Sequence, residues 1–287
     1  MHEDLVNGFN KMIDILISDR RCKGGWHYGS VSRGLDDQYS DFDPVFLVAD
    51  RDFENFAGDV DDIVGKICDE LLISWPEGYN SGYFKNFCNL IRIGENLHQL
   101  DFFILNSDHI DNWWCRQHLK GCTRANLIFD KNGEVAALLD KGLRTDNDRP
   151  DTMRCIDTYW FHIEMLIKYF KRKDIFKLIK NIDILFHAHA DLLLSEYDTL
   201  DWGGWETKVN KCVPIDKQTH LFGYFTNIDL QSYEAAIKHC MIDFNNDAKE
   251  VCTSKNMEYP VDIADQVMKY FNKHVNISQD LIEHANR

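Results

Sequence analysis

The sequence predicts an α+β protein in which an N-terminal domain of strands and helices, residues 1–148, precedes a C-terminal α-helical domain, residues 149–287. Two observations predict this division. Short apolar runs of strand length alternate with helical periods in the first half, whereas strand patterns nearly vanish after residue 151. Between the halves, the polar segment 144–151 combines turn-forming residues with no apolar periodicity, which is typical of a domain boundary.

The elements of the N-terminal half follow from local patterns. Apolar residues recur at helical spacing over 4–18, and short apolar blocks predict strands at 25–28 and 43–48. A helix is expected over 54–73. Two β-like runs, 83–93 and 98–105, predict a hairpin, and a strand at 125–129 and a helix at about 133–142 complete this half. In the C-terminal half the apolar periods predict helices over 152–173, 175–196, 229–253 and 260–274.

Composition excludes several classes of protein. With 32 Lys and Arg against 47 Asp and Glu, the formal net charge is −15, and no extended basic surface is available to neutralise a nucleic-acid backbone. No signal peptide and no apolar run of about 18 residues is evident, so we expect a soluble, cytoplasmic protein without a membrane partner. Nine cysteines without a C-x-x-C pair are expected to be reduced thiols.

The chemistry is predicted to lie in residues 26–48 and on the strand 98–105. Gly29 and Ser30 end a predicted strand, and Gly29 would let the backbone approach a phosphate to which Ser30 donates hydrogen bonds. Asp41 and Asp43 are two apart in a predicted strand, so both carboxylates can face one spot and offer Mg²⁺ two hard oxygen ligands. Asp101 is a third carboxylate in an apolar run, where an unpartnered charge is costly.

Together these residues resemble the nucleotidyltransferase superfamily of DNA polymerase β, whose motif is Gly-Ser, about ten residues, Asp-x-Asp and a third carboxylate on a neighbouring strand. More narrowly, YGSVSRGLDDQYSDFD and NLIRIGENLHQLDFF resemble segments of the lincosamide nucleotidyltransferases. The helix-forming segment 159–175 is similar to the long helix after the domain boundary in both the lincosamide enzymes and the aminoglycoside 6-adenylyltransferases. The segment 258–275 is similar to the closing helix of the streptomycin-type enzymes. The resemblance implies an N-terminal nucleotidyltransferase domain with a mixed β-sheet and flanking helices, and a C-terminal helical domain that completes the nucleotide and acceptor cleft.

The resemblance also implies a reaction: transfer of AMP from Mg-ATP to a hydroxyl of a small molecule, an aminoglycoside or lincosamide antibiotic, with release of pyrophosphate. Two Mg²⁺ ions are expected, with Asp41 and Asp43 bridging them and Asp101 completing one site and accepting the acceptor's proton. Without metal, repulsion among the three carboxylates should hold at least one proton unusually tightly.

Further cations are needed for the triphosphate. Arg33 near the Gly-Ser turn is one candidate, and Lys168 and Lys171, which share a helix face, are others. Each has a plainer interpretation: a charge in a surface loop for Arg33 and a solvated helix end for the lysines.

Three alternatives stay open at this point. The chain could be a protein-modifying nucleotidyltransferase of the toxin–antitoxin type, or a nucleotide-binding protein without turnover, and it could be a monomer or a homodimer. His187 and Asp191, four apart in a predicted helix, could suggest a metal site, but no further ligands are evident and ordinary helix residues are favoured.

Overall fold

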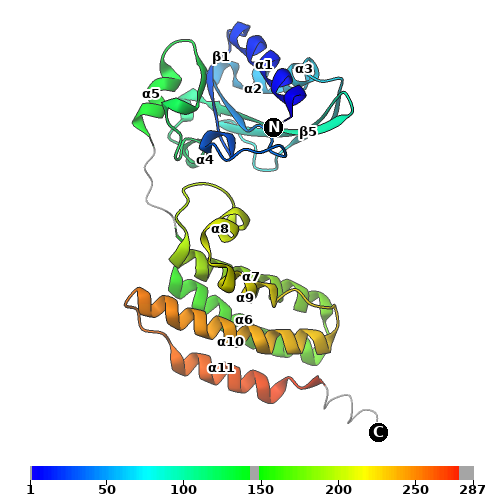
Figure 1. Cartoon of the computed structure of the whole chain (residues 1–287), viewed down its shortest axis with the longest axis vertical. Helices are drawn as coiled ribbons and strands as arrows, with labels where there is room; N and C mark the ends of the chain where they lie inside the picture. Colours follow the sequence, from blue (N-terminus) through cyan, green and yellow to red (C-terminus); the bar gives the residue numbers. More distant parts are fainter. Residues whose placement is uncertain (1, 143–148, 278–287) are drawn as a thin grey trace. The chain divides into compact units, whose positions relative to one another are not determined.

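The computed structural model describes residues 2–142 and 149–277, and the chain divides into two compact units, Met1–Asp146 and Asn147–Arg287 (Figure 1). The first unit contains a six-stranded mixed sheet, and the described part of the second contains helices and no strand. The predicted α+β fold class is therefore confirmed. Most of the predicted boundary segment, 144–148, lies outside the described residues.

The sheet has the strand order β3-β4-β5-β2-β1-β6. Only β2 and β5 pair in parallel, and the other neighbours are antiparallel. The strands are β1 (Cys22–His27), β2 (Pro44–Val48), β3 (Glu70–Pro76), β4 (Phe84–Ile93), β5 (Asn96–Asn106) and β6 (Leu127–Asp130). The predicted hairpin is β4 and β5, and the predicted strands at 25–28, 43–48 and 125–129 correspond to β1, β2 and β6.

Helices cover both faces of this sheet. On one face lie α1 (Glu3–Ser18), α2 (Asp50–Gly58) and α3 (Val60–Gly65), and on the other lie α4 (Trp113–Gln117) and α5 (Glu134–Lys141). Strand β2 is buried along its whole length: Phe46 packs with the first set of helices and Leu47 with the second. A strand covered on both faces has no need of polar alternation, which explains its continuous apolar run. Short 3₁₀ turns occur at η1 (Val31–Arg33), η2 (Ser107–His109) and η3 (Arg124–Asn126).

One predicted element is wrong. The single helix expected over 54–73 is two short helices, α2 and α3, followed by the strand β3. Gly58 ends the first helix and Gly65 the second, and β3 lies at the edge of the sheet with most of its side chains at least partly exposed. The backbone of β3 hydrogen-bonds with β4. A search for helical periodicity in the local sequence cannot detect such a pairing.

The described part of the second unit is a bundle of helices (Figure 1). Three of its long helices begin at aspartate caps. Asp151, Asp174 and Asp229 each accept a backbone N–H from the first turn of the helix that follows. The helices are α6 (Thr152–Arg172), α7 (Ile175–Tyr197), α8 (Trp205–Cys212), α9 (Ile215–Phe222), α10 (Leu230–Ser254) and α11 (Val261–His274). The four long helices were predicted, whereas α8 and α9 were not. No helix among the described residues is long and apolar enough to cross a bilayer.

Candidate active site

The turn after β1 places Gly29 against Asp43. Gly29 has φ +60°, and a Cβ built on it would lie 1.9 Å from Asp43 Oδ2. Both the backbone conformation and the available space therefore require glycine. Ser30 follows as the N-cap of η1, and the hydroxyl of Ser32 donates to the Gly29 carbonyl at 2.7 Å, which fixes the turn.

Asp41 and Asp43 are held in place by the residue between them. Phe42 is 4% exposed and stacks on Phe9 of α1, with ring centroids 3.9 Å apart. Its carbonyl accepts the N–H of Asp101 at 3.0 Å, and the carbonyl of Asp43 accepts the N–H of Tyr28 at 3.1 Å. The segment is thus fixed between β1 and β5, with Phe42 in the core.

Asp101 completes a group of three carboxylates. It lies on β5, the parallel neighbour of β2, and one ligand oxygen from each of Asp41, Asp43 and Asp101 lies within 4.8 Å of the other two. All three side chains are partly exposed. The structure therefore brings together the three carboxylates and the Gly-Ser turn that the sequence singled out.

Burial raises the pKa values of all three carboxyl groups, and repulsion by neighbouring carboxylates adds to the increase for Asp43 and Asp101. Burial raises the pKa of Asp43 to about 8, with further contributions from the charges of Asp41 and Asp101. Burial is also the main cause of the raised pKa values of Asp41 and Asp101. At neutral pH and without a cation, the group thus retains a proton, as expected for three clustered carboxylates.

The neighbours of Asp101 include a residue that the sequence analysis missed. Gln99, two residues earlier on β5, donates through Nε2 to Asp101 Oδ2 at 3.2 Å. Asp101 Oδ1 is buried, and no side chain or backbone group among the described residues donates to it. Gln99 could have been identified from the sequence, because side chains two residues apart in a strand, such as 99 and 101, point to the same face.

Arg33 is already engaged with backbone. Its Nη2 donates to the carbonyl of Lys120 at 3.0 Å, and Nη1 donates to the carbonyl of Gly121. These bonds tie η1 to the turn after α4, so a phosphate would have to compete with two carbonyls. Phosphate binding by Arg33 stays a prediction, and its observed contacts are structural.

Lys168 and Lys171 belong to the second unit, on the last turns of α6. Both are exposed, and Lys168 Nζ lies 5.8 Å from the ring centroid of Tyr169. Their part in nucleotide binding stays a prediction, as do the roles assigned to the other site residues.

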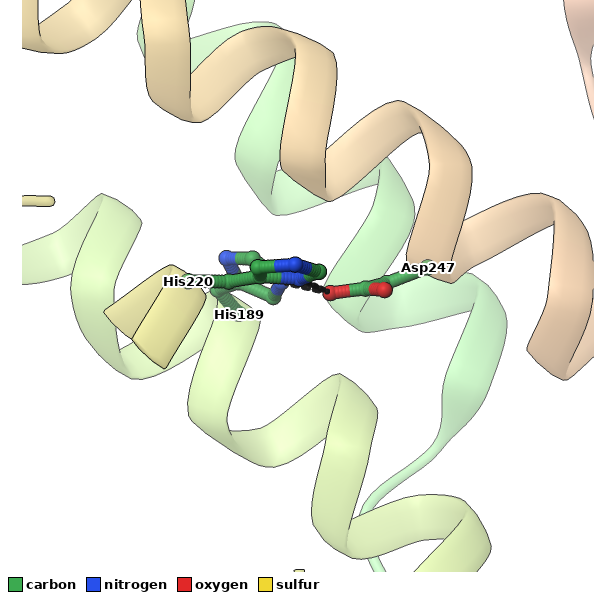
Figure 2. A group of neighbouring side chains, drawn as sticks. All are labelled: His189, His220 and Asp247. Carbon is green, nitrogen blue, oxygen red and sulfur yellow. Dashed lines mark hydrogen bonds and ion pairs between the residues drawn. The ribbon is translucent and has the colours of Figure 1, made fainter. Parts of the chain in front are cut away.

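The structure contains a second group of possible metal ligands, which the sequence analysis did not identify as a group. His187, which the sequence pairs with Asp191, instead lies 3.5 Å from Asp183. His189, two residues further on, meets His220 and Asp247 from two other helices (Figure 2). No local spacing could have indicated this group, since its members are on α7, α9 and α10.

Comparison with known proteins places the chain in a family. The family model described as streptomycin adenylyltransferase matches residues 9–274. The chain belongs to the streptomycin adenylyltransferase family. It is thus an adenylyltransferase, which confirms the predicted class of enzyme. Among solved structures it is similar to an aminoglycoside 6-adenyltransferase from Bacillus subtilis, with 14% identity, 95% of this chain and 98% of that chain covered, and a TM-score of 0.44. A search of curated proteins finds no match.

Among the described residues of the first unit, the three carboxylates form a group whose chemistry suits an adenylyltransferase. Oxygen ligands at one spot suit a hard cation and its phosphates, and the adjoining glycine turn leaves space beside them. A cavity of about 230 Å³ adjoins this spot, with Asp41, Gln99 and Tyr39 among its lining residues.

Proposed function

We propose that the chain transfers AMP from Mg-ATP to a hydroxyl group of an aminoglycoside antibiotic and releases pyrophosphate. Family membership supports the class of reaction, and the convergence of Asp41, Asp43 and Asp101 beside the Gly29 turn is the observation that carries the proposal. A polycationic acceptor is compatible with a net charge of −15, which favours its association with the enzyme.

The residues present fit a Mg²⁺ site. The donor set is three carboxylates, Asp101 Oδ1 lacks a hydrogen-bond donor among the described residues, and Asp43 keeps a proton that a cation would displace. Asp41 and Asp43 would hold two ions between them, and Asp101 would complete the shell of one. When bound, the ions would stabilise charge on the attacking and leaving oxygens of an in-line displacement.

The chain's own residues then have separate tasks. Asp101 would accept the proton of the acceptor hydroxyl as its oxygen forms a bond to the α-phosphorus and the bond to the pyrophosphate oxygen breaks. Gln99 would orient the Asp101 carboxylate for this proton transfer through its hydrogen bond to Oδ2. Gly29 keeps the space next to Asp43 free, and Ser30 would donate to a phosphate oxygen.

The proposal is tested by measuring pyrophosphate release from Mg-ATP with streptomycin, other aminoglycosides, a lincosamide and a mixture of host proteins as acceptors. We expect release with an aminoglycoside, together with a mass increase of one AMP on that antibiotic. Asp41→Asn should abolish the reaction, whereas Asp62→Asn, which removes an exposed carboxylate from α3, should not.

Two results would contradict the proposal. Adenylylation of a lincosamide or of protein alone would show that the acceptor is wrong. Binding of ATP without release of pyrophosphate under any of these conditions would favour a nucleotide-binding protein without turnover.

A further inference from the structure

Three polar side chains meet inside the helical unit. They are far in sequence from the carboxylates of the first unit and offer a different set of ligand atoms. His189 of α7 and Asp247 of α10 are fully buried, and the side chain of His220 on α9 is 28% exposed. Both rings point at one carboxylate oxygen: Asp247 Oδ2 lies 2.8 Å from His189 Nε2 and 2.7 Å from His220 Nδ1 (Figure 2). The adenylyl transfer proposed above uses none of the three.

The donor set is that of a transition-metal site. Two imidazole nitrogens and one carboxylate oxygen are common ligands of Zn²⁺, and the three donor atoms all lie within 4.8 Å of one another. Zn²⁺ binds such atoms at about 2.0–2.2 Å, so small movements of the side chains would place all three around one ion. The side chain of His220 is partly exposed, so the group is not sealed from solvent.

Outer contacts orient these ligands. The hydroxyl of Tyr224 donates to Tyr159 Oη at 3.1 Å, so its oxygen can accept Nδ1–H of His189, which lies 3.0 Å away. Without metal, Nε2–H of His189 donates to Asp247 Oδ2. With the proton on Nδ1 instead, Nε2 would offer its lone pair to a metal ion beside that oxygen. A histidine ligand held by a hydrogen bond on its other ring nitrogen is the usual arrangement around protein metals.

The surrounding charge also favours a cation. Helix α10 carries Asp243, Asp247 and Glu250, and Lys217 is the cation that contacts the last two, with Nζ 2.7 Å from Asp247 Oδ1 and also paired with Glu250. Lys217 binds the carboxylate oxygen that the histidines do not use. Asp247 can therefore keep this ion pair and still offer Oδ2 to a metal ion.

We propose that His189, His220 and Asp247 form a Zn²⁺ site that ties α7, α9 and α10 together, separate from the catalytic carboxylates. Because three chain segments supply its ligands, bound Zn²⁺ stabilises the folded helical unit by mass action.

The site is tested in the full chain carrying Asp43→Asn, which weakens cation binding at the carboxylate group of the first unit. We expect one equivalent of Zn²⁺ by calorimetric titration, and an increased melting temperature. Co²⁺ as a spectroscopic probe should give visible d–d bands without thiolate charge-transfer absorption, which separates this site from the nine free cysteines.

A matched pair of variants separates metal binding from hydrogen bonding. His220→Gln can still donate a hydrogen bond to Asp247 but loses the imidazole ligand, so Zn²⁺ affinity should fall at least about 100-fold while the fold is kept. His239→Gln changes a histidine of α10 whose side chain is 70% exposed, and should leave affinity unchanged. Absence of Zn²⁺ binding in the Asp43→Asn chain, or equal affinity in the two glutamine variants, would show that the group is a hydrogen-bonded network only.

Discussion

Asp43 links the chemistry of the site to the stability of the protein, and replacing it with asparagine separates the two. The raised pKa means that the folded chain holds a proton on Asp43 that the unfolded chain releases. Without divalent cations, the wild-type free energy of unfolding should therefore fall as the pH rises from about 4 to about 8. The asparagine amide does not titrate, so Asp43→Asn should escape this loss.

The size of the effect follows from the shift. An increase in pKa from 3.8 to about 8 corresponds to an upper limit of about 6 kcal/mol at high pH. Asp43 is partly exposed, and screening by water lowers this figure. We expect the stability of Asp43→Asn relative to wild type to increase by about 2–3 kcal/mol between pH 5 and pH 9.

The assay is urea unfolding of both chains in EDTA across this pH range, repeated with saturating Mg²⁺. Magnesium should increase the free energy of unfolding of the wild type at high pH and should have little effect on the variant, which has lost a ligand and has no such loss to recover. The variant should also have no transferase activity. Asp62→Asn, in which an exposed carboxylate is removed, should show a pH-independent difference from wild type. The same constancy in Asp43→Asn would refute the view that buried, mutually repelling carboxylates form this site.

Three further substitutions test the remaining roles. Asp101→Asn should lower the single-turnover rate by roughly 10² to 10⁴ while ATP still binds; loss of ATP affinity at an unchanged rate would make Asp101 a metal ligand only. Gly29→Ala should abolish turnover because its Cβ meets Asp43, whereas Gly34→Ala, with φ +64° but open space around it, should lose only about 1–2 kcal/mol of stability in urea unfolding. Lys168→Ala should raise the Michaelis constant for ATP, for a loss of about 2–3 kcal/mol, and Lys173→Ala should not; equal small effects would assign both lysines to a solvated helix end.

The parts of the fold that could be predicted are those specified by local patterns. The amphipathic period of α1, the buried run of β2 and the hairpin of β4 and β5 each carry their own signal. The prediction of one helix over 54–73 was wrong because β3 is specified by its pairing with β4 and not by a local pattern. An edge strand with exposed side chains has neither a buried run nor a regular alternation.

In the candidate site, too, features set by local spacing could be predicted, and features set by tertiary packing could not. Asp41, Asp43 and Gly29 are close in sequence, so spacing alone indicates a common location, and Asp101 could be added because it lies in an apolar strand. The engagement of Arg33 with two backbone carbonyls, by contrast, depends on where the turn after α4 passes. The meeting of His189 with Asp247 depends on helix packing, which no local period encodes.

The parallel pairing of β2 with β5 also sets the order in which the site can be assembled. A parallel pair needs a crossover, and here the chain passes through α2, α3, β3 and β4 before Asp101 returns beside Asp43. Two of the three carboxylates therefore leave the ribosome well before the third. Because long-range pairings of this kind form slowly, we expect the local helices and the β4–β5 hairpin to form before the active centre does.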